Sequence, residues 1–138
     1  MEELADLFQA RSRFVEALAG EEDPLGRARA MLASLPEEAR VEALNAHPRI
    51  GERRLSGRSA AEQGETAAED AEVMEELARL NADYEERFGF RFVVFVNRRP
   101  RAALLPVLRE RLAHDRVTEL ETGCDELVAI ARDRWQTR

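Results

Sequence analysis

Apolar residues recur every three or four positions along most of the chain, which is the spacing of one face of an α-helix. The first such stretch predicts one helix that ends at Gly20, with an apolar face of Leu4, Leu7, Phe8, Phe14, Val15 and Leu18. Asp23 before Pro24 is typical of an N-cap with proline at the first helical position, and predicts a helix through Leu32. The segment Ser34-Leu35-Pro36-Glu37-Glu38 repeats this arrangement and predicts a helix to about Asn45.

The second half continues in the same way. After a loop-like stretch over 50–58, the pattern predicts a short helix over 59–65 and a long helix from Thr66 or Glu69 to Phe88. Gly89 is expected to cap that long helix. A further helix is expected from Arg101 to His114, and Thr118-Glu119-Leu120-Glu121 reads as a capping box that opens the final helix.

The exception to this pattern is the aromatic and β-branched segment Phe90–Val96, which strand propensity favours. A strand needs a partner, and no second segment of the chain has the pattern of one. We therefore expect a short buried segment, extended or irregularly helical, whose backbone groups bind elsewhere. The fold class predicted is all-α, a single compact multi-helix domain over residues 1–138 with no significant β-sheet.

Composition narrows the class of protein. The chain is 44% hydrophobic and 36% charged, with a net charge of −7, which argues against a nucleic-acid partner. No apolar run approaches the roughly 20 residues that span a bilayer, so no membrane partner is expected. The acidic start Met1–Leu4 does not read as a signal peptide, and Gln136–Arg138 is no peroxisomal signal. All 21 basic residues are arginine, and a bacterial cytoplasm is the expected location.

Several kinds of chemistry lack the residues they need. The single cysteine, Cys124, excludes an internal disulfide and is interpreted as a small packing residue. Two histidines without a cysteine pair do not suggest a zinc site, so no metal is expected. The sequence has no glycine-rich phosphate loop and no Gly-x-Ser-x-Gly elbow. The absence of lysine removes Schiff-base mechanisms.

His47 is the first candidate for chemistry. Pro48 disfavours helical geometry at His47, so the imidazole is expected at a break in the chain. A lone histidine before proline is also a common structural feature, and both interpretations stay open on this segment alone. His114, near a predicted helix end, is expected to have a surface role.

Two further groups have both a structural and a functional interpretation. Ser59-Ala60-Ala61-Glu62 has the form of a capping box, followed by Gln63, and a helix start of this kind also offers free amides to anions. Arg132 and Arg134 lie about half a turn apart on the last predicted helix. One of them can therefore face inward, where a buried guanidinium requires an anionic partner.

Taken together, these segments resemble the OHCU decarboxylase family, whose members act in urate breakdown. The resemblance covers nearly the whole chain, and its most specific part is the string from Leu80 to Val93. It is carried in order by His47-Pro48, Ser59-Ala60-Ala61-Glu62-Gln63, Leu80-Asn81-Ala82-Asp83-Tyr84-Glu85-Glu86-Arg87-Phe88-Gly89-Phe90-Arg91-Phe92-Val93, Glu119-Leu120 and Ile130-Ala131-Arg132-Asp133-Arg134. The resemblance implies an all-α fold, a homodimer, and no metal or organic cofactor.

The resemblance also implies a reaction and a set of site residues. The reaction is the cofactor-independent decarboxylation of 2-oxo-4-hydroxy-4-carboxy-5-ureidoimidazoline (OHCU) to (S)-allantoin and CO₂, which makes the chain a carboxy-lyase. His47, Glu62 and Arg134, rather than Arg132, match the catalytic positions. The implied substrate-binding residues are Pro48, Ser59, Ala60, Ala61, Glu62, Gln63, Phe92, Val93, Val94, Phe95 and Val96.

Two departures and two alternatives accompany this reading. Arg49-Ile50-Gly51 replaces the Asp-Leu form that many members have after His-Pro. Asn97-Arg98-Arg99-Pro100 replaces a glycine-containing turn that many members have after Val96. This second departure leaves open where the pocket-lining segment ends. One alternative is a non-catalytic acidic helical interaction module, and the other is the same fold acting on a related ureido-imidazoline.

Overall fold

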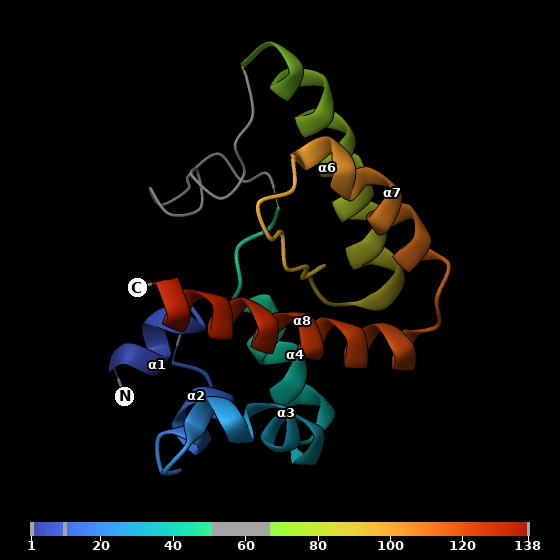
Figure 1. Ribbon diagram of the computed structural model, residues 1–138. Helices are drawn as coiled ribbons and strands as arrows, with labels where there is room; N and C mark the ends of the chain where they lie inside the picture. Colours follow the sequence, from blue (N-terminus) through green and yellow to red (C-terminus); the bar gives the residue numbers. More distant parts are fainter. Residues whose placement is uncertain (1, 10, 51–66, 138) are drawn as a thin grey trace. The chain divides into compact units, whose positions relative to one another are not determined.

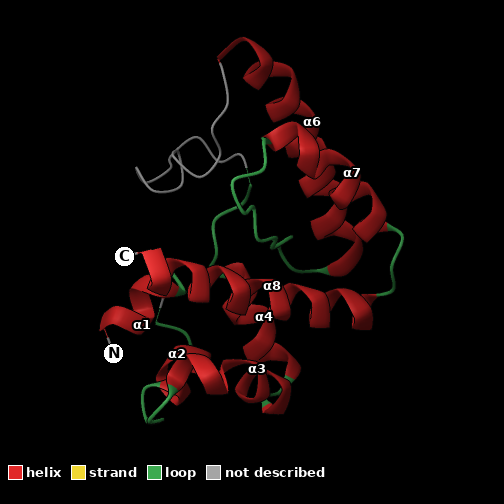
Figure 2. Ribbon diagram, in the orientation of Figure 1, coloured by secondary structure: helices red, strands yellow, loops and turns green. Residues whose placement is uncertain are grey.

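The computed structural model describes residues 2–9, 11–50 and 67–137, and all regular structure within these ranges is helical (Figures 1 and 2). The predicted all-α class is therefore confirmed. The helices are α1 (Glu2–Leu7), α2 (Arg13–Leu18), α3 (Pro24–Ser34), α4 (Glu37–Asn45), α6 (Ala67–Phe88), α7 (Arg101–Leu112) and α8 (Arg116–Thr137). None of these helices is both long and apolar enough to cross a membrane.

The chain divides into two compact units, which are described separately here. Unit 1 consists of Met1–Pro48, Val93–Phe95 and Arg116–Arg138, and unit 2 of Arg49–Phe92 and Val96–Asp115. The expectation of one domain over 1–138 stays a prediction.

The first predicted helix is two helices, so that part of the prediction is wrong. α1 ends at Leu7, Gln9 adopts a left-handed backbone with φ of 69°, and α2 begins at Arg13. The Ser12 hydroxyl caps α2 by accepting the Val15 N–H at 3.3 Å. Both halves nevertheless present one apolar face, because Phe8 and Phe14 are buried and meet edge to face at 4.9 Å. Periodicity therefore predicted the buried face correctly and missed the break.

The starts of α3 and α4 show where capping was predicted correctly and where it was not. Asp23 accepts the Gly26 N–H at 3.2 Å with Pro24 as the first helical residue, as expected. α4 begins at Glu37, but Pro36 precedes it without a side-chain cap. Ser34 instead ends α3 and donates its hydroxyl to the Met31 carbonyl at 2.8 Å.

The final helix, α8, begins two residues before the predicted capping box. It starts at Arg116, directly after Asp115, so Thr118 lies inside the helix and that predicted cap is wrong. Within unit 1, α8 packs against α1, α3 and α4, as Figure 1 shows. Its buried face includes Leu120, Leu127 and Ala131.

Unit 2 is built on α6 and α7, which pack together and run in the same direction (Figure 1). The segment between them folds back after Gly89, whose φ of 81° and N–H bond to the Glu85 carbonyl confirm the predicted cap. Around Tyr84 lies an aromatic cluster, with ring centroids at 4.6 Å to Phe88, 6.0 Å to Phe90 and 5.3 Å to Phe92. The string 80–92 thus supplies the aromatic part of the core of this unit, beside Leu77, Leu104 and Leu108.

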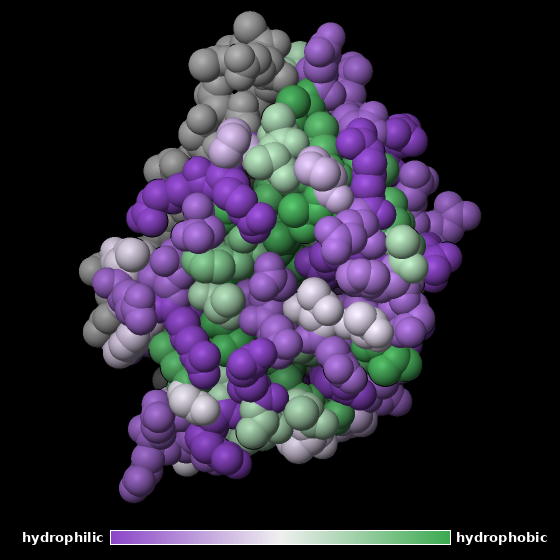
Figure 3. Space-filling view, turned by 45° about the vertical axis from the view of Figure 1, so that its right-hand side comes forward, coloured by the Kyte–Doolittle hydropathy of each residue, from purple (hydrophilic) through white to green (hydrophobic). Residues whose placement is uncertain are grey.

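The surface is mostly hydrophilic, in agreement with the 36% of charged residues in the sequence. Hydrophilic residues cover most of the face drawn in Figure 3, with hydrophobic residues between them. Among the described large hydrophobic residues, Val117 is the exposed one, at 70%.

Candidate functional site

His47 lies at the break that Pro48 predicted. α4 ends at Asn45, and the His47 N–H donates to the Leu44 carbonyl at 3.1 Å in a final turn. The His47 side chain is only 8% exposed. An imidazole held in a buried bend directly after a helix suits a group that exchanges protons with a small molecule.

Directly after Pro48, the chain enters unit 2 and is fastened to α6. Arg49 donates from Nε to Glu85 Oε2 at 2.7 Å and from Nη2 to Glu85 Oε1 at 3.0 Å. The buried Asn81 side chain donates through Nδ2 to the Ile50 carbonyl at 3.2 Å. Two consecutive residues are therefore held by polar groups one turn apart on α6.

Arg134 is the inward-facing arginine of the last helix. It is 4% exposed, whereas Arg132 is exposed and donates to the Leu25 carbonyl at 3.1 Å. Arg134 Nη1 donates to the Leu7 carbonyl at 3.3 Å. With the Gln9 amide oxygen turned toward it, Gln9 accepts from Nη1 and Nη2 at 2.5 and 3.2 Å. The prediction that one of the two arginines faces inward is confirmed, and α1 and the turn after it supply oxygen acceptors.

The segment 92–96 forms no strand, as expected; Phe92, Val93 and Val94 are buried, and Phe95 and Val96 are half-buried. Val93 and Val94 are 1% and 2% exposed, and the Phe95 N–H donates to Glu126 Oε1 on α8 at 3.0 Å. The segment ends at Val96, because Asn97 and Arg98 both have positive φ (50° and 61°) and the Arg99 N–H returns to the Val96 carbonyl at 3.0 Å.

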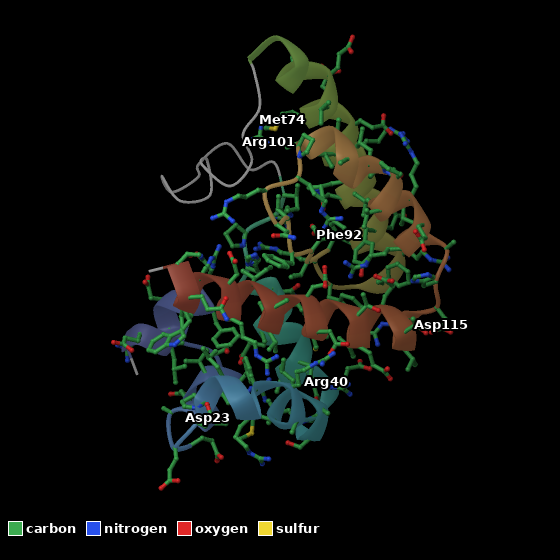
Figure 4. All side chains as sticks on the ribbon, viewed as in Figure 1. Asp23, Arg40, Met74, Phe92, Arg101 and Asp115 are labelled. Atoms are coloured by element: carbon green, nitrogen blue, oxygen red, sulfur yellow. The ribbon has the colours of Figure 1, made fainter. Side chains whose placement is uncertain are left out.

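Phe92 lies in unit 2 under a buried arginine. The Arg111 guanidinium carbon is 4.5 Å from the Phe92 ring centroid and 5.9 Å from that of Tyr84. Tyr84 lies on α6 and Arg111 on α7, and Phe92 is labelled in Figure 4. Cation–π contacts of this kind stabilise a desolvated guanidinium and hold the ring in place.

Some of the predicted site residues belong to unit 1. It contains the histidine, the arginine and part of the apolar segment, namely His47, Pro48, Val93, Val94, Phe95 and Arg134, while Phe92 and Val96 belong to unit 2. Ser59, Ala60, Ala61, Glu62 and Gln63 lie outside the described residues.

A hollow of about 890 Å³ opens elsewhere in unit 1, at the ends of α1 and α8. Its rim carries the carboxylates of Glu3, Glu22 and Asp23 against one cation, Arg132. It contains no residue of the predicted site, and a negative rim does not suit a carboxylate substrate. We therefore do not assign the site to this hollow.

The remaining chemical candidates are the single cysteine and a possible metal site. Cys124 is buried, and burial raises the pKa of its thiol to about 11, which fits the predicted packing role. Within the described ranges, no group of three or more His, Cys, Asp or Glu residues could hold a metal ion.

Comparison with known proteins decides the family. A model of the OHCU decarboxylase family matches residues 2–136. The chain belongs to the OHCU decarboxylase family. A crystal structure of OHCU decarboxylase in the presence of (S)-allantoin is similar with a TM-score of 0.78 and 26% sequence identity, covering 97% of this chain and 95% of that one.

Two curated relatives that this chain matches are longer than the matched region. The 2-oxo-4-hydroxy-4-carboxy-5-ureidoimidazoline decarboxylase of Haloferax volcanii is 36% identical over 104 residues, which are 73% of this chain and 62% of the relative. The uric acid degradation bifunctional protein TTL of Arabidopsis thaliana is 33% identical over 102 residues, 68% of this chain and 32% of that protein. The matched part of this chain thus spans less than two thirds of either relative.

Sequence reasoning missed the polar side chains that bind the chain directly after Pro48 and the segment 93–95. Asn81 and Glu85 belong to the string that carries the resemblance, but the sequence analysis assigned neither side chain a role. Glu126 directly precedes the buried Leu127 on α8, and its contact with Phe95 is visible only in the fold. In each case the partner is a backbone group or side chain at least 31 positions away in sequence.

Proposed function

We propose that this protein decarboxylates OHCU to (S)-allantoin and CO₂ during urate breakdown, as a carboxy-lyase without a cofactor. The observation that carries the proposal is the family match over residues 2–136. The similar fold of an OHCU decarboxylase crystallised in the presence of (S)-allantoin supports it. So does the burial of His47 and Arg134, because a charge-bearing side chain is rarely buried without a partner or a role.

The substrate itself supplies the electron sink. Its carboxylate and hydroxyl share one ring carbon, and the neighbouring carbon forms a C=N bond and bears the ureido group. When the bond to the carboxylate breaks, its electron pair forms a C=C bond between these two carbons, and the C=N nitrogen takes a proton. The hydroxyl then loses its proton as a C=O forms, and the ureido-bearing carbon gains a proton. CO₂ is the only fragment lost.

The protein's part is orientation and proton delivery. His47 acts as general acid and base on the hydroxyl proton, and Glu62 orients it. Arg134 and amides near Ser59 hold the anionic and ureido oxygens. Gln63 and the backbone of 92–96 recognise the ring and ureido amides, with Pro48 shaping the pocket. A proton delivered to one face of the ureido-bearing carbon gives the (S) product.

The experiment follows the handedness of the product. OHCU is generated freshly from 5-hydroxyisourate, and the circular dichroism of the forming allantoin is recorded with and without the protein. The spontaneous reaction gives racemic product, so the protein is expected to produce a transient excess of (S)-allantoin. Racemic product at the uncatalysed rate contradicts the proposal and favours the non-catalytic interaction module.

We propose in addition that the protein works as a homodimer in a bacterial cytoplasm. The resemblance to a family of homodimers supports the first part, and the arginine-only set of basic residues supports the second. Light scattering coupled to size-exclusion chromatography tests the dimer, with 15.7 kDa as the mass of one chain.

A further inference from the structure

The Glu126 carboxylate holds the backbone at Phe95, the half-buried residue that directly follows the buried Val93 and Val94. Glu126 Oε1 accepts the Phe95 N–H at 3.0 Å, and both residues belong to unit 1. This segment forms no strand, so its peptide groups have no ladder to satisfy them. A carboxylate is a strong acceptor for such an N–H, because the bond is charge-assisted.

The neighbouring acid on α8 makes a different contact. Asp125 forms an ion pair with Arg29 at 3.0 Å, and both side chains are more than half exposed. Glu126 is half-buried and next to Leu127, which is 1% exposed. Of two adjacent carboxylates on one helix, Asp125 thus binds an exposed arginine and Glu126 a half-buried backbone N–H, so Asp125 provides a matched control.

α8 also carries Arg134, eight positions after Glu126 and therefore about 12 Å further along the helix axis. The same rigid helix thus holds the inward-facing guanidinium and the Phe95 backbone. A displacement of Phe95 from Glu126 changes the place of the segment 93–95 with respect to that guanidinium.

We infer that Glu126 is a positioning residue of the decarboxylation, which rests on the function proposed above. Its carboxylate fixes the backbone of Val93–Phe95 in the orientation that recognises the substrate's amide groups. It acts through the Phe95 peptide group and neither touches the substrate nor transfers a proton. Since the Phe95 N–H is already bonded to Glu126, other backbone groups of the segment make the substrate contacts.

Three variants separate the acceptor oxygen from the charge and from the reach of the side chain. Glu126→Gln keeps an oxygen at the same place, so KM is expected to stay within about threefold of wild type. Glu126→Asp keeps the charge but is one methylene shorter, and Glu126→Ala removes the acceptor. Both are expected to raise KM about tenfold and to lower the enantiomeric excess, because misplaced contact groups weaken substrate orientation. Asp125→Asn is the control and is expected to match wild type.

A second readout follows the hydrogen bond itself. Exchange of the Phe95 amide proton, measured by NMR in the whole protein, is expected to accelerate at least tenfold in the Asp and Ala variants and to change little in the Gln variant. The Asp variant keeps a charged group at this half-buried position, so the test survives if the Ala variant fails to fold.

The outcomes distinguish this inference from the proposed function. Chiral product from wild type together with a raised KM in the Asp variant and its recovery in the Gln variant supports the inference. Chiral product with wild-type KM in the Asp and Ala variants overturns the inference alone, and so does a loss confined to the melting temperature. Racemic product from wild type overturns the proposed function, and the inference with it.

Discussion

Arg49 and Glu85 form a two-point ion pair, with Nε to Oε2 at 2.7 Å and Nη2 to Oε1 at 3.0 Å. Arg49 follows His47 by two residues, so the ion pair binds the chain directly after the His47-Pro48 bend to α6. The resemblance alone left Arg49 as a departure from the usual family form. The structure gives this arginine a definite partner on α6.

The first prediction concerns the strength of that pair. Its side chains are 41% and 26% exposed, so a double-mutant cycle with Arg49→Gln and Glu85→Gln is expected to give a coupling energy of about 1 kcal/mol in urea unfolding. The Arg29–Asp125 pair, with 58% and 52% exposure, is the control and is expected to couple more weakly. Equal coupling in the two pairs would contradict the distinction between a half-buried and a solvent-screened contact.

The backbone at Gly89 gives a second prediction. Its φ is 81°, and a Cβ built there meets no atom within 4 Å, so conformational strain is the whole cost of a side chain. Gly89→Ala is therefore expected to lower the free energy of unfolding by about 1 kcal/mol. Gly20→Ala is the control and is expected to change it by less than about 0.5 kcal/mol, because a Cβ at Gly20 would make an ordinary contact, 4.0 Å from the Ala17 carbonyl oxygen, and the Gly20 backbone is not left-handed. An unchanged free energy of unfolding in Gly89→Ala would contradict a left-handed backbone at the end of α6.

Cys124 gives a prediction about pH. Burial raises the pKa of its thiol to about 11, so at pH 8 only about one molecule in a thousand carries the reactive thiolate. Alkylation by iodoacetamide in the folded protein is expected to be slow at pH 8. The rate is expected to rise about tenfold per pH unit up to pH 10, because thiolate forms as pH approaches the raised pKa. Protein unfolded in urea is the control and should react readily at pH 8. Rapid labelling of the folded protein would mean that the thiol is not a packing group.

The arginines of α8 give a fourth prediction. Arg134→Lys keeps a positive charge but loses the planar fork that reaches two oxygens at once, and is expected to lower kcat/KM about 100-fold. Arg132→Lys, at an exposed position on the same helix, is expected to stay within about twofold. Steady-state kinetics on OHCU measures both. A larger loss from Arg132→Lys would mean that the two roles are exchanged.

The ends of helices were predictable where a clear capping residue marks them. The end of α6 at Phe88 and Gly89 and the start of α3 at Asp23 and Pro24 are of this kind. The break at Gln9 was not predictable, because neither glycine nor proline marks it and the apolar face continues across it. The start of α8 was misplaced because Thr118-Glu119-Leu120-Glu121 has the form of a capping box, whereas the helix begins directly after Asp115, which is also an N-cap residue type.

The site was predictable to a different degree. The half-turn spacing of Arg132 and Arg134 indicated that only one could face inward, and Pro48 indicated the bend at His47. The acceptors of Arg49 and of the Phe95 N–H, Glu85 and Glu126, lie at least 31 positions away from them in sequence. No local spacing marks contacts of this kind, so only the fold reveals them.

The most direct test of the account compares His47→Ala with wild type in the chiral assay. Wild type is expected to produce a transient excess of (S)-allantoin, and His47→Ala is expected to return the reaction to the spontaneous rate and racemic product, with helical circular dichroism unchanged. His114→Ala is the control and is expected to behave as wild type. An unchanged rate and enantiomeric excess in a folded His47→Ala protein would contradict the role of His47 as the proton-transferring group.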